Sequence, residues 1–161
     1  MKITKNFSLI ELISSDTAKR ENISNMPGNK EMSNLVDLCE NVLQPLRNFM
    51  GKSIKVNSGY RSPKLNTKIG GSRTSSHMKG EAADIECEND NFNIKMFKFI
   101  LENLKFDQCI IYKSKYGRPR FVHVSFSKIE NRKQSMLKRD GGGYELINVK
   151  SVLKEFDEKW H

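Results

Sequence analysis

The chain has 161 residues, enough for one domain with a substantial core and too few for two comfortable domains. A hydrophobic fraction of 37%, with nine Phe, excludes a disordered chain, and no run of about 18 apolar residues is present that would cross a membrane. The formal net charge of +9 favours a polyanionic partner, either nucleic acid or an anionic surface such as a bacterial wall, although a Lys-rich solvated surface alone would produce it.

The N-terminal region predicts a short helix followed by a loop. Residues 6–13 carry an apolar face, and Asn6 or Ser8 is in position to cap the helix. Residues 14–29 are polar, and the Pro-Gly-Asn sequence that starts at Pro27 marks a turn. We therefore expect a loop there, with one short helical turn inside it.

A longer amphipathic helix is expected over residues 31–50, where apolar residues recur at helical spacing and form one buried stripe. Pro45 lies inside this stretch and removes one backbone donor, so the pattern predicts a kink or a restart near Gln44. Gly51 comes next and is a plausible C-terminal cap.

The middle of the chain alternates short strands with helices and loops. Residues 54–60 and 83–88 alternate as strands, and residues 93–104 form a second amphipathic helix. Between the two strands, residues 65–71 end in two Gly and are interpreted as a flexible loop.

The C-terminal half predicts a hairpin and a closing helix. Residues 109–112 and 121–126 are expected to be strands joined by a turn at 114–119. The chain is then basic and polar until three Gly at 141–143, and residues 151–160 form an amphipathic helix. Helices mixed with short strands, several joined by hairpin-length turns, indicate the α+β class.

Two features bear on the setting in which the chain works. Cys39, Cys87 and Cys109 are far apart, odd in number and in apolar contexts, so we expect reduced core residues and neither a disulfide framework nor a CxxC metal site. Residues 1–7 lack the apolar core of a signal peptide. We therefore expect a chain made without an export signal of its own.

The most informative stretch is 74–85, in which a His and an Asp stand seven residues apart with a Gly and small residues between them. His nitrogen and Asp oxygen are ordinary zinc ligands, and a catalytic zinc needs three protein ligands with one position open. His77, Asp84 and His123, which lies in an alternating segment, form such a set. Each residue alone is more often structural. Of the three His in the chain, the last, His161, is the terminal residue and is expected to be frayed.

These residues belong to a motif that resembles the M15 family of zinc D-Ala-D-Ala peptidases, in particular its phage-type branch, whose members act on bacterial peptidoglycan. The motif is Ser75-x-His77-x-x-Gly80-x-Ala82-x-Asp84, preceded by Ser58-Gly59-Tyr60-Arg61-Ser62 and followed by Val122-His123-Val124. Further similar segments lie at 7–12, 42–47, 65–66, 106–108 and 131–133. The resemblance spans about residues 6 to 139, and the residues after Asp140 are interpreted as a local addition.

The resemblance implies one α+β domain over residues 1–161, with residues 140–161 as the C-terminal addition. It implies a hedgehog/DD-peptidase-like fold in which a small antiparallel sheet carries the zinc site and helices pack on the sheet. It also implies that His77, Asp84 and His123 bind Zn²⁺.

The resemblance assigns roles to two further residues. It implies that Arg61 holds a substrate carboxylate and that Ser75 lies near the substrate or supports the metal site. The chemistry agrees, because a guanidinium grips a carboxylate with two parallel hydrogen bonds and is always charged. Glu81 occupies a variable position of the motif and is expected to be solvated.

The general base that would accept a proton from the attacking water is absent from the position where the family usually carries it. Family members commonly carry an acidic residue shortly before the second zinc His, and such a base is typically worth about 10²–10⁴-fold in rate. Here Arg120 stands three residues before that His, and Tyr112 stands where the phage-type branch often has Glu. Either Asp107 or Glu86 substitutes, or the site hydrolyses slowly or only binds. Asp107 also has a structural interpretation, as a turn residue or a partner of a ligand His.

Three functions are compatible with these observations. The first is a zinc peptidase that cuts peptidoglycan stem peptides next to D-Ala, encoded by a phage or prophage, made in the host cytoplasm and acting at the wall or carried in a virion. The second is a virion or wall-binding protein that retains the zinc site but has lost efficient catalysis. The third, a nucleic-acid-binding protein, rests on charge alone, because no zinc-finger spacing, RNP-like motif or Arg-rich helix supports it.

The expected partners are stem peptides, anionic wall polymers and virion proteins, with no membrane and no specific nucleic acid. A basic tract, residues 113–139, predicts the wall polymers, because it contains a single acid, Glu130, and a positive field at the mouth of the site would attract anions. The basic residues of the tract are Lys113, Lys115, Arg118, Arg120, Lys128, Arg132, Lys133, Lys138 and Arg139.

Overall fold

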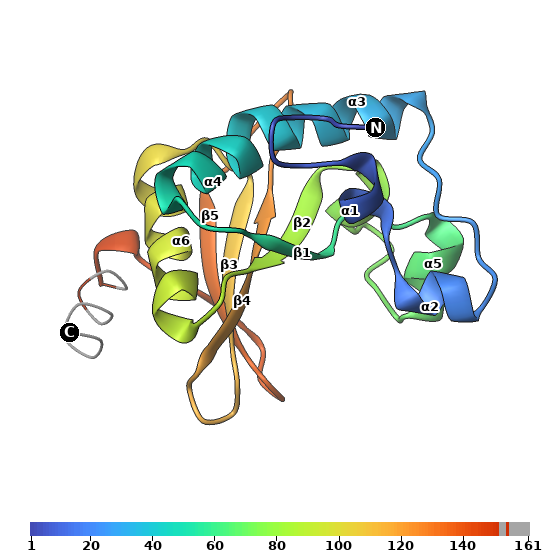
Figure 1. Ribbon diagram of the computed structural model, residues 1–161. Helices are drawn as coiled ribbons and strands as arrows, with labels where there is room; N and C mark the ends of the chain where they lie inside the picture. Colours follow the sequence, from blue (N-terminus) through green and yellow to red (C-terminus); the bar gives the residue numbers. More distant parts are fainter. Residues whose placement is uncertain (152–153, 155–161) are drawn as a thin grey trace.

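A six-stranded mixed sheet forms the centre of the molecule in the computed structural model, which describes residues 1–151 and 154 (Figure 1). The strands are β1 Lys55–Ser58, β2 Ala82–Glu86, β3 Gln108–Lys113, β4 Pro119–Ser125, β5 Gln134–Arg139 and β6 Tyr144–Leu146. Their order across the sheet is β1-β2-β4-β3-β5-β6. β3 and β5 are parallel, and the other neighbouring pairs are antiparallel.

The expectation of a small antiparallel sheet is wrong in both size and strand direction. The sequence predicts no strand after residue 126, but β5 and β6 extend the sheet on the side of β3. After β4 the chain returns to the start of β3, where the N–H groups of Lys133 and Gln134 donate to the carbonyl oxygens of Phe106 and Asp107. β5 therefore begins beside the beginning of β3 and runs parallel to it.

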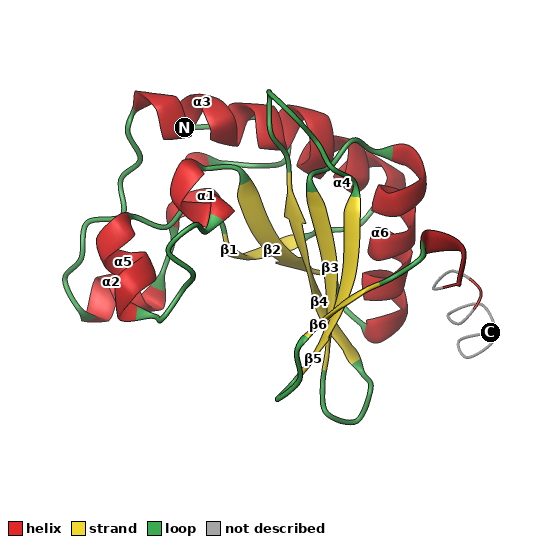
Figure 2. Cartoon of the chain, turned by 180° about the vertical axis from the view of Figure 1, so that it is seen from behind, coloured by secondary structure: helices red, strands yellow, loops and turns green. Residues whose placement is uncertain are grey.

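The helices surround one face and one edge of this sheet (Figure 2). They are α1 Leu9–Ile13, α2 Asp16–Arg20, α3 Asn29–Leu38, the π turn η1 Cys39–Leu43, α4 Gln44–Met50, α5 Pro63–Lys68, the 3-10 turn η2 Ser76–Lys79 and α6 Asp90–Asn103. α6 contacts β3 and β4, and α4 lies beside α6, whereas α1 contacts β1 at the edge. Among the described residues no helix is long and apolar enough to cross a membrane.

The N-terminal helices follow the predicted pattern with a few shifts. Ser8 caps α1, accepting from the N–H of Glu11, whose carboxylate accepts from the N–H of Ser8. The α-helical hydrogen-bonding pattern of the long helix is interrupted near the expected place by the π turn η1, which ends just before Gln44. Pro45 follows in the first turn of α4, where a missing N–H is tolerated. Gly51 ends α4 with left-handed φ of 62°.

Two predicted segments differ from the structure or lie outside it. Residues 65–71 were expected to be a flexible loop, but α5 covers most of them, because Ser62 caps its N-terminus and Pro63 starts its first turn. α6 begins at Asp90, three residues earlier than expected, since Asn89 provides its cap. Of the helix expected over residues 151–160, only Ser151 and Lys154 lie within the described residues.

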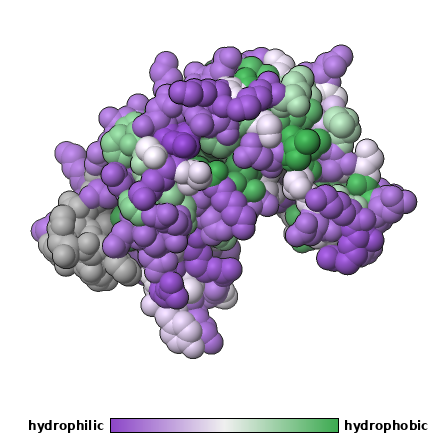
Figure 3. Space-filling model, viewed as in Figure 1, coloured by the Kyte–Doolittle hydropathy of each residue, from purple (hydrophilic) through white to green (hydrophobic). Residues whose placement is uncertain are grey.

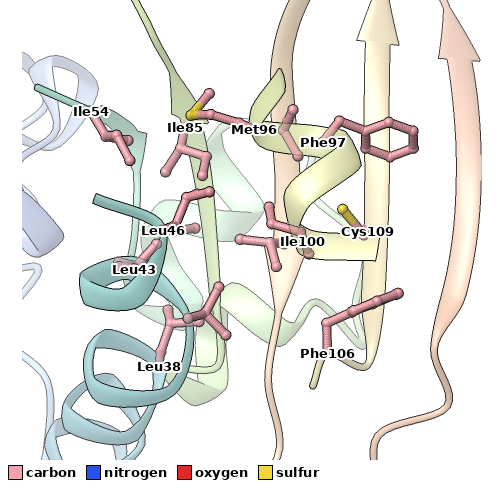
Figure 4. Close-up of a cluster of buried hydrophobic side chains, with 14 of the residues drawn as sticks. Leu38, Leu43, Leu46, Ile54, Ile85, Met96, Phe97, Ile100, Phe106 and Cys109 are labelled. Carbon is pink, nitrogen blue, oxygen red and sulfur yellow. The ribbon is translucent and has the colours of Figure 1, made fainter. Parts of the chain in front are cut away.

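The core fills the space between the sheet and the helices α3, α4 and α6 (Figure 4). Alternate residues of the strands point into it, and the buried strand residues are Ala83, Ile85, Val122, Val124, Cys109, Ile111 and Leu137. All three cysteines are buried free thiols, as predicted. Because side chains alternate along a strand, the intervening residues lie on the opposite face and are available for a site.

A matched pair of glycines tests how closely the site loop packs on α3. Gly80 and Gly70 both have left-handed backbone, with φ of 71° and 73°. A Cβ at Gly80 would lie 2.4 Å from the carbonyl oxygen of Glu31, whereas a Cβ at Gly70 would meet nothing within 4 Å. We expect Gly70→Ala to lower the free energy of unfolding by about 1–2 kcal/mol through backbone strain. Gly80→Ala should cost roughly 1–3 kcal/mol more, because the α3 backbone must move.

Urea denaturation of the two variants measures this difference. Equal losses of stability would show that the contact between Gly80 and Glu31 contributes nothing.

Candidate metal centre

Three side chains with metal-binding atoms meet on the face of the sheet opposite the core. Asp84 in β2 is paired in register with His123 in β4, so their side chains lie next to each other on the same face. His77 reaches them from η2. One ligand atom from each of the three residues lies within 4.8 Å of the other two. The structure thus brings together the three residues that the sequence selects, while His161 lies outside the described residues.

The hydrogen bond that His77 makes with Gly59 turns the unprotonated ring nitrogen of His77 toward Asp84. Nδ1 of His77 lies 2.7 Å from the carbonyl oxygen of Gly59. A carbonyl oxygen only accepts, so Nδ1 carries the proton and Nε2 of the neutral ring does not. Nε2 lies 3.4 Å from Oδ1 of Asp84, which also only accepts when ionised. Two acceptors that face each other in a buried site indicate a cation between them.

The spacing of one pair of donor atoms matches that around a zinc ion, and the second pair is closer. Donor atoms of a tetrahedral zinc, each at about 2.0–2.1 Å from the metal, lie about 3.4 Å apart. Oδ1 of Asp84 is 3.4 Å from Nε2 of His77 and 2.8 Å from Nδ1 of His123. Two nitrogens and one carboxylate oxygen are a common set of ligands for this metal, and three protein ligands leave a fourth position open.

The protonation of the ligands also favours a metal. Burial lowers the pKa of His77, which keeps the imidazole neutral, as a metal ligand must be. Burial alone would raise the pKa of Asp84, but its hydrogen bond with His123 outweighs that effect and holds the pKa well below its usual range. Asp84 therefore remains an anion in a mostly buried position.

The loop that carries His77 is fixed by its own backbone and by its neighbours. Oγ of Ser75 accepts from the N–H of His77 at 3.3 Å and caps η2. Gly80 ends η2 in the left-handed conformation. The N–H of Arg61 donates to the carbonyl oxygen of His77 at 3.1 Å. Ser75 thus supports the segment that carries a ligand, and it also lines the cleft above the ligands.

Arg61 contacts the candidate metal ligand directly. Its Nη2 lies 3.3 Å from Oδ2 of Asp84, and its Nε donates to Oγ of Ser58 at 2.9 Å. The guanidinium therefore holds the carboxylate oxygen that does not face the two imidazoles. Arg61 also lines the cleft, where its remaining N–H groups are candidates for binding a substrate carboxylate.

A cleft of about 720 Å³ opens over the three ligands. Residues 70–72 and 74–77 line it, and Met136 and Tyr144 bring β5 and β6 into its lining. The face of the molecule seen in Figure 3 is mostly hydrophilic, and a hollow separates the part formed by α2 and α5 from the body. The cleft is large enough for a short peptide segment.

The candidate base Asp107 lines the cleft but is tied to an arginine. Its two oxygens accept from Nε and Nη2 of Arg132 at 2.9 and 2.8 Å, and Oδ1 also accepts from the N–H of Arg132 at 3.0 Å. These hydrogen bonds, the side-chain ones first, lower the pKa of Asp107. A carboxylate occupied in this way is a poor proton acceptor, and the structural interpretation of Asp107 fits the contacts better.

The positions of the Glu86 and Glu81 carboxylates both differ from the sequence-based expectation. Glu86 pairs with Lys55 at 3.5 Å and does not line the cleft. Glu81, expected to be solvated, is half-buried and lines the cleft. Burial raises its pKa, and the charge of Asp107 adds to this, although Lys79 opposes it. Within the described part of the chain, the Glu81 carboxylate has no ion-pair partner within 4 Å.

Two tyrosines complete the lining and were not predicted as site residues. Tyr112 of β3 and Tyr144 of β6 both face the cleft, and their hydroxyl oxygens lie 3.3 Å apart. The sequence drew attention to Tyr112 only because an acid was expected there. No signal in the sequence pointed to Tyr144, which lies beyond the segment covered by the resemblance.

The basic tract is less positive than its sequence suggests. Among the described residues, five of its bases form the ion pairs Arg118 with Asp90, Arg120 with Asp140, Lys128 with Asp37, Arg132 with Asp107 and Arg139 with Glu145. Their partners come from outside the tract, so the local excess of positive charge is partly neutralised.

Comparison with known proteins agrees with the geometry. The family model described as Peptidase M15 matches residues 5–125. The zinc D-Ala-D-Ala carboxypeptidase of Streptomyces albus G is 45% identical over 51 residues, which is 31% of this chain and 20% of that protein. The match thus spans about a fifth of that relative. The family match includes Arg61, Ser75 and all three candidate ligands, and the chain belongs to the peptidase M15 family.

Proposed function

We propose that the chain is a zinc-dependent peptidase that hydrolyses peptidoglycan stem peptides next to D-Ala. The observation that carries this proposal is the meeting of His77, Asp84 and His123 in one cleft with zinc-like donor spacing. Membership of the M15 family and the similarity to a protein named as a zinc D-Ala-D-Ala carboxypeptidase support the substrate class.

Each group in the cleft has its own part in the reaction. A bound zinc would act as a Lewis acid and lower the pKa of a coordinated water. The hydrogen bond to Gly59 orients His77, and Arg61 holds Asp84 while its free N–H groups bind the carboxylate of the stem peptide. Glu81 takes the proton from the attacking water, because it is the cleft carboxylate that is neither a ligand nor paired with an arginine.

A phage or prophage origin, with action at the wall or from a virion, remains part of this proposal. The motif segments that resemble the phage-type branch support it. The runner-up function is a wall-binding or virion protein that retains the zinc site with weakened catalysis. Tyr112 and Arg120 favour this alternative, since neither supplies a carboxylate and Arg120 pairs with Asp140. Anionic wall polymers remain proposed partners, bound by Lys115, Lys133 and Lys138 of the basic tract.

Digestion of purified peptidoglycan tests the function directly. We expect wild-type protein to release stem-peptide fragments whose new ends lie next to D-Ala, as shown by mass spectrometry, and a chelator to abolish the release. Metal analysis should give about one zinc per chain, falling sharply in His77→Ala and His123→Ala because a three-ligand site loses a third of its donors. Binding to walls without any cleavage would favour the runner-up, and full zinc retention in both variants would exclude these ligands.

Two conservative variants identify the proton acceptor. Glu81→Gln should lower turnover by about 10²-fold or more while zinc content is kept, because the amide cannot accept the proton. Asp107→Asn should have the smaller effect. In the wild type, activity should decrease as the pH falls through the raised pKa of Glu81, because the protonated carboxyl group cannot accept a proton. Glu81→Gln should not show this decrease. The reverse ranking of the two variants would make Asp107 the acceptor.

Arg61→Lys tests the grip on the substrate carboxylate. The ammonium keeps the charge but loses the two-pronged fork, so activity on peptides with a free terminal carboxylate should fall roughly tenfold or more. Zinc content should stay unchanged. Arg73→Lys, on the exposed loop outside the cleft lining, is the matched control and should behave as wild type. A parallel loss of zinc in Arg61→Lys would instead assign Arg61 to holding Asp84.

A further inference from the structure

A second row of side chains runs beside the metal ligands on the same face of the sheet. In the first row the register places Asp84, His123, Ile110 and Met136 next to one another. In the second row it places Phe121, Tyr112, Lys138 and Tyr144 next to one another. The two rows are two residues apart along β3, which is about 7 Å. A tyrosine in the second row can therefore extend its hydroxyl toward a substrate bound over the first.

Tyr112 is held in place from two sides. Its ring is stacked on Phe121, with centroids 4.4 Å apart and an interplanar angle of 12°. Its hydroxyl oxygen lies 3.3 Å from that of Tyr144. The ammonium of Lys138 lies 4.8 Å from the centre of the Tyr144 ring and helps to hold that ring in turn. The Tyr112 hydroxyl is thus fixed in the cleft by neighbours that are not ligands of the metal.

The hydroxyl pair supplies a hydrogen-bond donor. Two hydroxyls that share one hydrogen bond use one of their two protons, and when Tyr144 donates, the proton of Tyr112 is left for a ligand. Burial above all raises the pKa of Tyr112, and the negative charge of Asp84 adds to this effect. The phenol therefore keeps its proton at neutral pH and cannot serve as a base, which leaves the role of donor.

We propose that Tyr112 is a catalytic residue that donates a hydrogen bond to the carbonyl oxygen of the scissile amide, and that Tyr144 is its positioning residue. The inference rests on the proposed peptidase function. When the water oxygen bonds to the carbonyl carbon, the π electrons move to the carbonyl oxygen, and the Tyr112 O–H stabilises the negative charge without transferring its proton. The proton of the water passes to the cleft carboxylate and then to the leaving amine as the C–N bond breaks.

The decisive variant is Tyr112→Phe, which keeps the stacked ring and removes the donor. We expect turnover to fall by about 10²-fold, the usual effect of losing one such donor, with KM and zinc content unchanged. Tyr144→Phe should lose less, because the donor remains and only its orientation is relaxed. Tyr116→Phe is the matched control and should equal wild type, because Tyr116 lies in the β3–β4 turn with an exposed fraction of 82%.

A binding measurement complements the kinetics. Calorimetry should follow a phosphinate analogue of the stem peptide, whose tetrahedral PO₂ group replaces the scissile amide, and the product peptide that carries the freed amine. Tyr112→Phe should bind the phosphinate about 10²-fold more weakly and this product peptide with unchanged affinity, because the amine-side product lacks the oxygen atom that Tyr112 contacts.

The outcomes separate the two proposals. If wild type cleaves walls and binds the phosphinate, and Tyr112→Phe does both equally well, the role of Tyr112 is overturned and the peptidase function stands. Equal losses for the phosphinate and the product peptide would also overturn it, because Tyr112 would then contribute to binding in general. If wild type neither cleaves walls nor binds the phosphinate, both proposals fall together.

Discussion

The carboxylate of Asp84 is the group on which the site depends. Its Oδ1 faces the nitrogens of His77 and His123, and its Oδ2 faces Arg61. The four residues come from η2, two strands and the loop after β1, so one anion joins segments that are distant in the sequence. Without it, the guanidinium of Arg61 would remain in a largely buried place with no counter-charge, which is strongly unfavourable. The same contact therefore shapes the site and holds the loops on the sheet.

One face of the sheet packs against the apolar core and the other lines the cleft. This division allows a small domain to contain a polar site without placing polar groups in its core. Alternate residues of β2, β3 and β4 face the helices and form the apolar core, while their neighbours face the cleft. The core side sets the strand register, and the register places Asp84 beside His123 and Ile110 beside His123. Substitutions at cleft positions should therefore leave the packing of the core largely unchanged.

Much of the site and part of the fold were predictable from local sequence. Two of the candidate ligands, His77 and Asp84, stand in a short motif, and the third, His123, stands in an alternating segment. The helices around residues 6–13, 31–50 and 93–104 follow from apolar periodicity, with shifts at their ends from caps such as Asn89. β5 was missed because Met136 and Leu137 are its only apolar residues, and its partner β3 is remote in sequence. The approach of Tyr144 to Tyr112 depends on that same distant pairing, which no local pattern encodes.

The short edge strand β6 gives the cleft a wall that can open independently of the core. Three register pairs attach β6 to β5, and its residues are exposed. Segments with few buried contacts open locally at much lower free energy than the whole domain unfolds. Amide hydrogens of β6 should therefore exchange far faster than those of β4, which lies between two strands. Each such opening would widen the cleft and separate Tyr144 from Tyr112, so access to the cleft can change at this edge while the core stays intact.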